Sequence, residues 1–142
     1  MIKIITYKPA YEVYTFLVNA GGAISTSALK ELYNEDILEK AYKHLYINKY
    51  AKRYRKNNEE FLILYDNENF DPDWAKIVGT LAVKMHLKGG KLEKNKLFFP
   101  SGSEFEFSLD KNKREIRFGC YKIQVSKLLK SGIDIADIIE EI

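Results

Sequence analysis

Residues 22–64 read GAISTSALKELYNEDILEKAYKHLYINKYAKRYRKNNEEFLIL, and three successive segments of this stretch decide the fold. The first is a helix expected over 28–33, because the preceding Ser25-Thr26-Ser27 offers hydroxyl oxygens for an N-cap. The second is a helix expected over 35–47, with Asn34 as its cap. The apolar side chains of this second helix have helical spacing and are Leu38, Ala41, Tyr42 and Leu45.

The third segment is a β-hairpin with a basic first strand. Alternating side chains predict strands over 50–55 and 60–65. Asn57-Asn58 lies between them and can adopt the positive φ angles that a tight two-residue turn requires.

Another helix precedes this stretch. Pro9 suits the first turn of a helix that runs to about Asn19, and Gly21-Gly22 ends it. The apolar face expected for this helix consists of Tyr11, Tyr14, Leu17 and Val18, widened by Val13 and Phe16. The order is therefore three helices followed by a hairpin.

This order and its apolar spacing resemble the winged helix-turn-helix superfamily of DNA-binding proteins. The residues that carry the resemblance are Gly22-Ala23-Ile24-Ser25, Leu29, Leu32, Leu38, Ala41, Leu45, Lys52-Arg53-Tyr54-Arg55 and Phe61-Leu62-Ile63-Leu64. In that family a small turn precedes the second helix, and the third helix enters the major groove. The wing grips the DNA backbone or the minor groove.

The whole chain also resembles the small winged-helix accessory proteins of plasmids and conjugative elements, of the relaxosome or replication-relaxation type. Together the two resemblances imply a DNA-binding accessory or regulatory protein of a mobile element, with transcription regulation among the expected roles. Its partner would be double-stranded DNA.

The rest of the chain predicts a helix followed by a small antiparallel sheet. Asp71-Pro72 starts the helix, because Asp caps and Pro suits the first helical position, and Gly89-Gly90 ends it. Strands are expected over 96–99, 104–109 and 115–121, and helical pieces over 124–131 and 134–141.

We therefore expect an α+β protein with two parts. Residues 1–66 form the winged-helix module. Residues 67–142 form a helix–strand–helix extension that packs on the module or mediates dimerisation, so that a homodimer or a protein partner would use this part. The phenylalanines of the expected strands alternate as in a sheet core or a dimer seam.

Charge is distributed in blocks along the chain, although the net charge is only +3. Residues 34–58 carry seven Lys or Arg against three acids, and residues 59–73 carry six acids and no Lys or Arg. Residues 74–130 carry thirteen Lys or Arg against five acids. Two basic blocks separated by an acidic connector suggest two faces or two subdomains, and ordinary solvated surface fits the same pattern.

The expected DNA contacts come from the third helix and the wing. They are Lys40, Lys43, His44, Lys49, Lys52, Arg53, Arg55 and Lys56. Such a set can neutralise several phosphates. Three acids on the same helix, Glu35, Asp36 and Glu39, would repel phosphates, although a glutamate can accept a hydrogen bond from a cytosine amino group. These acids also complement the helix dipole, so a purely structural role fits them too.

The rival hypothesis is a protein–protein adaptor or inhibitor with a winged-helix shape. The acids on the third helix and the acidic connector favour it. The geometry of the charges distinguishes the two hypotheses, because the DNA hypothesis weakens if the basic side chains of the wing and of the third helix do not share one face. Further lysines and arginines of the second half could extend the basic surface or serve as solubility features.

We expect no enzyme, no cofactor and no metal site. The nearest approach to a metal-dependent nuclease is Asp110 with Glu115-Ile116-Arg117, where Arg stands in place of the expected Lys. A single cysteine, Cys120, excludes a Cys-based zinc site, and His44 and His86 have no partner at metal-ligand spacing. The sequence shows no signal peptide and no apolar run long enough to span a bilayer, so we expect a cytoplasmic protein without a membrane partner.

Overall fold

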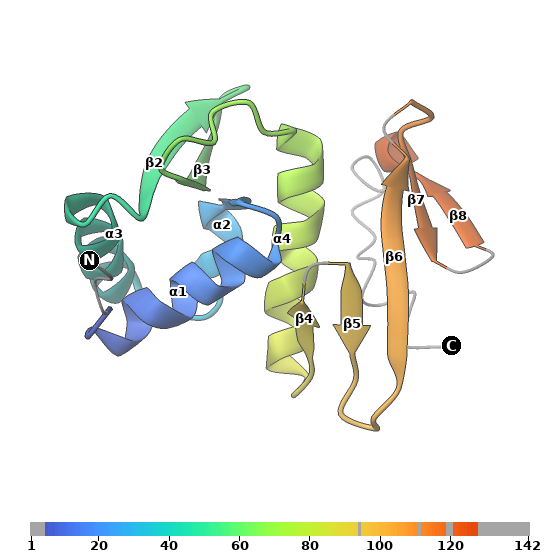
Figure 1. Ribbon diagram of the computed structural model, residues 1–142, viewed down its shortest axis with the longest axis horizontal. Helices are drawn as coiled ribbons and strands as arrows, with labels where there is room; N and C mark the ends of the chain where they lie inside the picture. The colour runs from blue at the N-terminus through green and yellow to red at the C-terminus, as the bar shows by residue number, and fades with distance from the viewer. Residues whose placement is uncertain (1–4, 94, 111, 119–120, 128–142) are drawn as a thin grey trace.

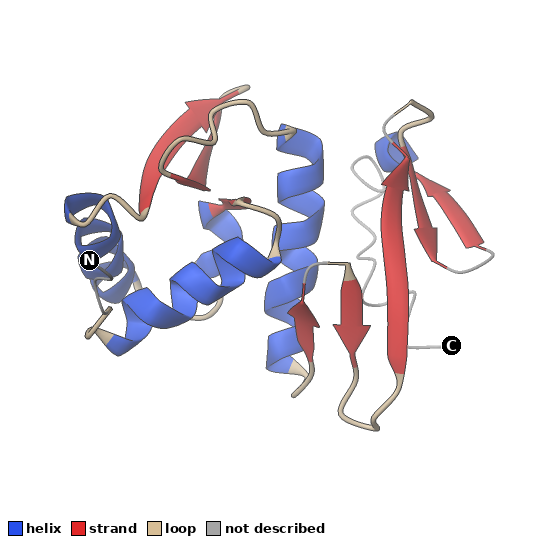
Figure 2. Ribbon diagram, in the orientation of Figure 1, coloured by secondary structure: helices blue, strands red, loops and turns tan. Residues whose placement is uncertain are grey.

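A central helix, α4 (Pro72–Leu87), separates two antiparallel sheets (Figure 1). The computed structural model describes residues 5–93, 95–110, 112–118 and 121–127. The fold is mixed α+β, with one small sheet on each side of this helix (Figure 2).

The first half of the chain contains three helices and one three-stranded sheet. Its elements are α1 (Lys8–Asn19), β1 (Ala23–Ser25), α2 (Thr26–Leu29), α3 (Glu35–Ile47), β2 (Ala51–Lys56) and β3 (Glu59–Leu64). The strand order is β1-β3-β2, so β3 is central and pairs with both neighbours in antiparallel fashion. Leu62 of β3 faces Ile24 on one side and Arg53 on the other.

The second half forms a five-stranded meander after α4. Its strands are β4 (Lys91–Glu93), β5 (Lys96–Phe98), β6 (Glu104–Asp110), β7 (Glu115–Phe118) and β8 (Tyr121–Gln124). They are ordered as in the sequence, and every neighbouring pair is antiparallel. The sheet lies against α4 on the side away from α3 (Figure 1).

The caps and the tight turn expected from the sequence are confirmed. The Asn34 side chain accepts a hydrogen bond of 2.9 Å from the Ile37 amide at the start of α3. Asn57 and Asn58 have φ angles of 55° and 62° in the β2–β3 turn. Asp71 accepts hydrogen bonds from the first amides of α4. Each motif acts locally, so neighbouring residues alone determine it.

The helix expected over 28–33 is wrong in its bounds, because α2 begins at Thr26 and ends at Leu29. Its N-cap residue, Ser25, makes no side-chain capping bond. The Ser25 hydroxyl instead donates to a Glu59 carboxylate oxygen at 3.0 Å, and the Thr26 hydroxyl donates to the Glu60 carbonyl at 3.2 Å. The pairing of β1 with β3 thus uses the hydroxyls that the sequence had suggested for capping.

The apolar face expected for α1 is also partly wrong. Ala10, Val13 and Leu17 point into the core, whereas Tyr11 and Val18 are exposed. The small side chain of Ala10 allows α1 to pack closely on its neighbours. Ala10, Val13 and Leu17 follow i, i+3, i+7 spacing and form the buried face, and Tyr11 lies outside this face. The large exposed side chains on this helix are therefore surface features.

The strands of the second half are confirmed in part. β5 and β6 lie where the sequence predicts strands, but the single strand expected over 115–121 is two strands, β7 and β8. β4 was not expected, because only one of its three residues is apolar. Residues 125–127 are helical, and the remainder of the helical pieces expected over 124–131 and 134–141 lies outside the described residues.

Helix α4 is buried on two sides. Its side chains Ile77, Val78, Leu81, Ala82 and Met85 form one core with the second sheet. On the opposite side, Gly79 approaches β1 so closely that a Cβ added there would lie 2.6 Å from Ile24 Cγ1 and 3.4 Å from the Ser25 amide nitrogen. A glycine is therefore required where the helix crosses the strand.

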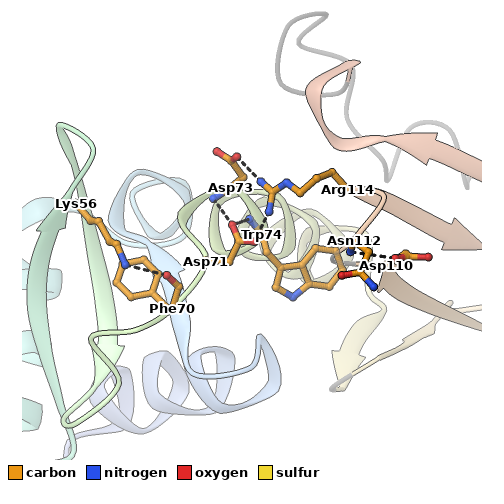
Figure 3. A network of polar contacts seen from close by, with 8 residues as sticks. All are labelled: Lys56, Phe70, Asp71, Asp73, Trp74, Asp110, Asn112 and Arg114. Atoms are coloured by element: carbon orange, nitrogen blue, oxygen red, sulfur yellow. Dashed lines mark hydrogen bonds and ion pairs between the residues drawn. The ribbon is translucent and has the colours of Figure 1, made fainter.

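An ionic contact also links α4 to the second sheet. Figure 3 shows Arg114, in the β6–β7 turn, pointing at the carboxylates of Asp71 and Asp73. The Arg114–Asp73 pair has an N–O distance of 2.6 Å. Because Asp71 also caps α4, the start of the helix and the turn share one side chain.

Gly79→Ala should lower the free energy of unfolding by about 1 kcal/mol. Overpacking costs about 1–3 kcal/mol and outweighs the gain of ~1 kcal/mol from replacing glycine inside a helix. Urea unfolding followed by Trp74 fluorescence measures the difference. Thr80→Ala, at the next position and partly exposed, is the control and should change stability by less than about 0.5 kcal/mol. An unchanged or higher stability of Gly79→Ala would contradict the close crossing.

Candidate nucleic-acid interface

One side of α3 is free of packing partners from the core. The core face consists of Leu38, Ala41, Tyr42 and Leu45. The opposite face carries acids, lysines and two large apolar side chains, Tyr46 and Ile47, which are 57% and 63% exposed. This outward face adjoins the β2–β3 hairpin, since α3 leads directly into β2 and contacts it.

The start of the chain covers part of this helix. The ring of Tyr7 stacks on the His44 imidazole with centroids 5.1 Å apart, and the Lys40 ammonium lies 4.8 Å from the same tyrosine ring. Lys40 remains exposed, whereas His44 is half-buried. Three α3 residues were predicted to contact DNA. Lys40 and Lys43 are exposed to solvent, whereas the Tyr7 ring stacks on the His44 imidazole and partly covers it.

An open groove of about 610 Å³ runs between α3 and β2. It is lined by Glu39, Lys40, Tyr42, Lys43, Tyr46 and Arg53. Three of the eight predicted contacts, Lys40, Lys43 and Arg53, therefore share one concave surface. Arg55 lies on the same side of β2 as Arg53, because alternate residues of a strand point to the same face.

Arg53 is held in this groove by two carboxylates. Its Nη1 donates to both carboxylate oxygens of Glu39, at 2.9 and 2.8 Å, and its Nη2 lies 3.1 Å from a Glu60 oxygen. Partial burial works to lower the pKa of Arg53, but the hydrogen bonds and charges of Glu60 and Glu39 outweigh it and raise the pKa. The guanidinium is thus fixed in place and neutralised by its neighbours.

Tyr42 forms the floor beneath that guanidinium. The Arg53 Cζ lies 5.1 Å from the centroid of the tyrosine ring, and Tyr42 is only 6% exposed. Its hydroxyl is buried and has no hydrogen-bond partner among the described residues. Burial raises the pKa of this hydroxyl above its ordinary value, so the group is protonated at neutral pH. Tyr42, which lines the groove, therefore carries a buried hydroxyl with no hydrogen-bond partner among the described residues.

The other side of the hairpin faces the connector between β3 and α4. Lys52 forms an ion pair with Glu68, and its ammonium lies 5.3 Å from the Tyr65 ring. The hydrogen bond between the two side chains raises the pKa of Lys52 and lowers that of Glu68. Lys56 donates to the carbonyl oxygen of Glu68 at 3.3 Å and to that of Phe70 at 3.1 Å, and Figure 3 shows the contact with Phe70. Both lysines therefore anchor the connector.

The eight predicted contacts consequently do not all share one face, which weakens the DNA hypothesis in the form that the sequence suggests. Lys40, Lys43, Arg53 and Arg55 lie on the groove side, and Lys52 and Lys56 lie on the connector side. Lys49 is exposed between α3 and β2, with a φ angle of 60°. Within the described part of the chain, Lys43, Lys49 and Arg55 have no carboxylate partner.

The acidic connector is largely neutralised within the protein. Five of its six acids pair with cations: Glu59 with Lys76, Glu60 with Arg53, Glu68 with Lys52, and both Asp71 and Asp73 with Arg114. Sequence patterning shows the excess of acids but cannot show their partners, which lie as far as 43 residues away.

Cations of the second half are similarly paired. Lys91 lies 2.8 Å from Glu93, Lys96 lies 3.8 Å from Glu106, and Arg117 lies 3.3 Å from Asp110. The last pair includes the arginine that replaces the lysine of a nuclease motif. Arg117 thus forms an ion pair with Asp110, one of the carboxylates that such a motif would need to bind its metal ion.

Two features of the groove were missed in the sequence. Tyr42 and Tyr46 line it, whereas the sequence pattern indicates only a core position for Tyr42 and no site role for Tyr46. Tyr46 follows Tyr42 by one turn, and this i, i+4 spacing places both rings on neighbouring parts of the helix surface. The sequence therefore shows the i, i+4 spacing of the two tyrosines, but it does not show that β2 lies beside them.

In the described ranges, no three His, Cys, Asp or Glu side chains are grouped so that they could hold a metal ion. None of the helices that the structure describes has the length and apolar character needed to cross a membrane. Comparison of the chain with protein-family models, with curated proteins and with solved structures finds no match.

Lys56→Met should lower the free energy of unfolding by about 1–2 kcal/mol, because it removes hydrogen bonds from a charged donor to two backbone carbonyls. Arg55→Met on the same strand is the control and should change stability by less than about 0.5 kcal/mol. Thermal and urea unfolding measure both. Equal effects of the two substitutions would contradict the anchoring role of Lys56.

Proposed function

We propose that this protein binds duplex DNA through α3 and the β2–β3 hairpin, as a DNA-binding accessory or regulatory protein. The observation that carries the proposal is the groove between these two elements, which brings Lys40, Lys43 and Arg53 onto one concave surface. The exposed Lys40 and Lys43 of this surface attract the phosphates of a duplex and release their counterions on binding. Arg53, in contrast, is paired with Glu39 and Glu60 before DNA arrives.

The order of elements in residues 1–66 supports a winged helix-turn-helix module. Three helices, with one short strand after the first, are followed by the hairpin, and the sheet order is β1-β3-β2. In such a module the third helix lies in the major groove and the hairpin contacts the backbone beside it. We assign these roles to α3 and to the β2–β3 hairpin.

The charges of the groove side divide the work between two kinds of contact. Lys43, Lys49 and Arg55 are exposed and are assigned to phosphates. Arg53 is paired with Glu39 and Glu60 within the groove and is assigned to a phosphate, and its release leaves Glu39 to accept a hydrogen bond from a cytosine amino group. Lys52 and Lys56 are removed from the list of contacts, because they hold the connector.

A second candidate is a protein–protein adaptor or inhibitor with the same fold. The observation that favours it is the pair of exposed apolar side chains, Tyr46 and Ile47, at the end of α3. The acidic connector no longer favours it, since most of its acids pair within the chain. The second sheet is proposed as the surface for a homodimer or a protein partner in either case.

Binding to a labelled random duplex of about 30 base pairs tests the proposal at several salt concentrations. The double variant Lys43→Gln/Arg55→Gln should weaken binding to all sequences. It should also reduce the slope of log K against log salt by about 2, because two phosphate contacts are lost.

The matched control is Lys113→Gln/Lys122→Gln, which removes two exposed charges from the second sheet. This variant should bind as the unmodified protein does. An equal loss in both variants would mean that net charge, and not the groove, determines binding. Absence of binding at low salt would sink the DNA proposal and leave the adaptor as the working hypothesis.

A further inference from the structure

We propose that the groove between α3 and β2 takes an unpaired nucleobase together with its adjoining phosphate. The preferred ligand is then DNA with an extruded or single-stranded nucleotide at the contact point, and not a fully paired duplex. The inference rests on the proposed function, since it concerns the same groove, and it specifies which form of DNA that groove recognises.

The first observation is the exposed ring of Tyr46 on the groove wall. The side chain is 57% exposed, although tyrosine carries a large apolar surface. Tyr65 supports it from the neighbouring segment, with ring centroids 6.2 Å apart and an interplanar angle of 42°. A supported aromatic ring that faces solvent is the arrangement by which proteins stack single-stranded bases.

The second observation is the buried hydroxyl of Tyr42 at the groove floor. Tyr42 is more than nine-tenths buried, and its hydroxyl has no hydrogen-bond partner in the described part of the chain. Buried polar groups almost always have a partner, so an unsatisfied one next to a groove points to a ligand atom. Every base carries donors and acceptors on its Watson–Crick edge, which is exposed only when the base is unpaired.

The third observation is the position of the positive charges. Lys43 precedes Tyr46 by three residues and Lys40 precedes Lys43 by three, so each of these residues is a surface neighbour of the next along α3. Both lysines line the groove. A base stacked on Tyr46 therefore has cations beside it for its phosphate.

Arg53 explains how the floor becomes accessible. Its guanidinium covers the Tyr42 ring and is retained by Glu39 and Glu60, which are both partly exposed. A phosphate competes with these carboxylates for the guanidinium, because arginine binds either group through the same forked donors. Movement of Arg53 towards the phosphate uncovers the Tyr42 ring, so that a base edge can approach this side chain and its hydroxyl.

The size of the groove agrees with one nucleotide. Its volume of about 610 Å³ lies within the range of roughly 300–1,000 Å³ that small-molecule sites occupy. A base inside a duplex has neighbours on both faces, so it can stack on Tyr46 only after it leaves the helix. The groove is therefore suited to a single flipped base.

The experiment compares two forms of one labelled duplex. In one form 2-aminopurine is paired, and in the other it is bulged without a partner. The unmodified protein should bind the bulged form roughly 5- to 100-fold more tightly, the range expected for one stacked base. It should also quench the 2-aminopurine fluorescence of the bulged form.

Tyr46→Ala should abolish the preference and the quenching but retain binding to the paired duplex. Tyr46→Phe should retain both, because a phenyl ring stacks as a phenol ring does. Both substitutions replace an exposed side chain, and a melting curve of each variant verifies that it is folded.

Each other outcome has a distinct meaning. Equal affinity for the two duplexes, or a preference that survives Tyr46→Ala, would overturn the inference and leave the proposed duplex binding intact. Absence of binding to both duplexes would overturn the proposed function and the inference together.

Discussion

The crossing of α4 over β1 is the constraint on which the rest of the structure depends. Gly79 admits Ile24 so closely that no larger residue fits, and this fixes the helix on the first sheet. The same helix supplies the core of the second sheet from its other side. With α1, β1 and α4 packed together, α3 and the hairpin are the elements left facing outward (Figure 1). The groove itself lies within the first half, between α3 and β2.

The basic side chains of β2 fall into two sets, because successive residues of a strand point to opposite faces. One set holds the connector and the other faces α3. Residues at even positions of β2 turn towards the connector, where Lys52 and Lys56 hold Glu68 and Phe70 in place. Residues at odd positions turn towards α3, where Arg53 meets Glu39. A one-residue change of register would exchange these two sets, because successive side chains of a strand point to opposite faces. The tight turn at Asn57 and Asn58 fixes that register.

The sequence correctly predicted the parts of the fold that are determined by interactions between neighbouring residues. Asn34, Asp71-Pro72 and Asn57-Asn58 act on amides or dihedral angles within a few residues. The bounds of α2 and the existence of β4 depend on strands that pair across the fold, so no local pattern revealed them. The same limit applies to the site. Composition identified the basic residues, but only the tertiary structure shows that Lys52 and Lys56 are engaged, that Arg53 is neutralised, and that Tyr46 stands beside them.

The contact between Arg114 and Asp71 has a consequence for the motions of the molecule. One carboxylate oxygen of Asp71 caps the first turn of α4, and the other receives the guanidinium from the β6–β7 turn. Fraying of the first turn of α4 and detachment of the β6–β7 turn are thus coupled, because either event releases the Asp71 side chain from one of its partners. Hydrogen exchange at the Asp73 and Trp74 amides consequently reports on the second sheet as well as on the helix. The start of α4 and the β6–β7 turn are thus coupled through one side chain.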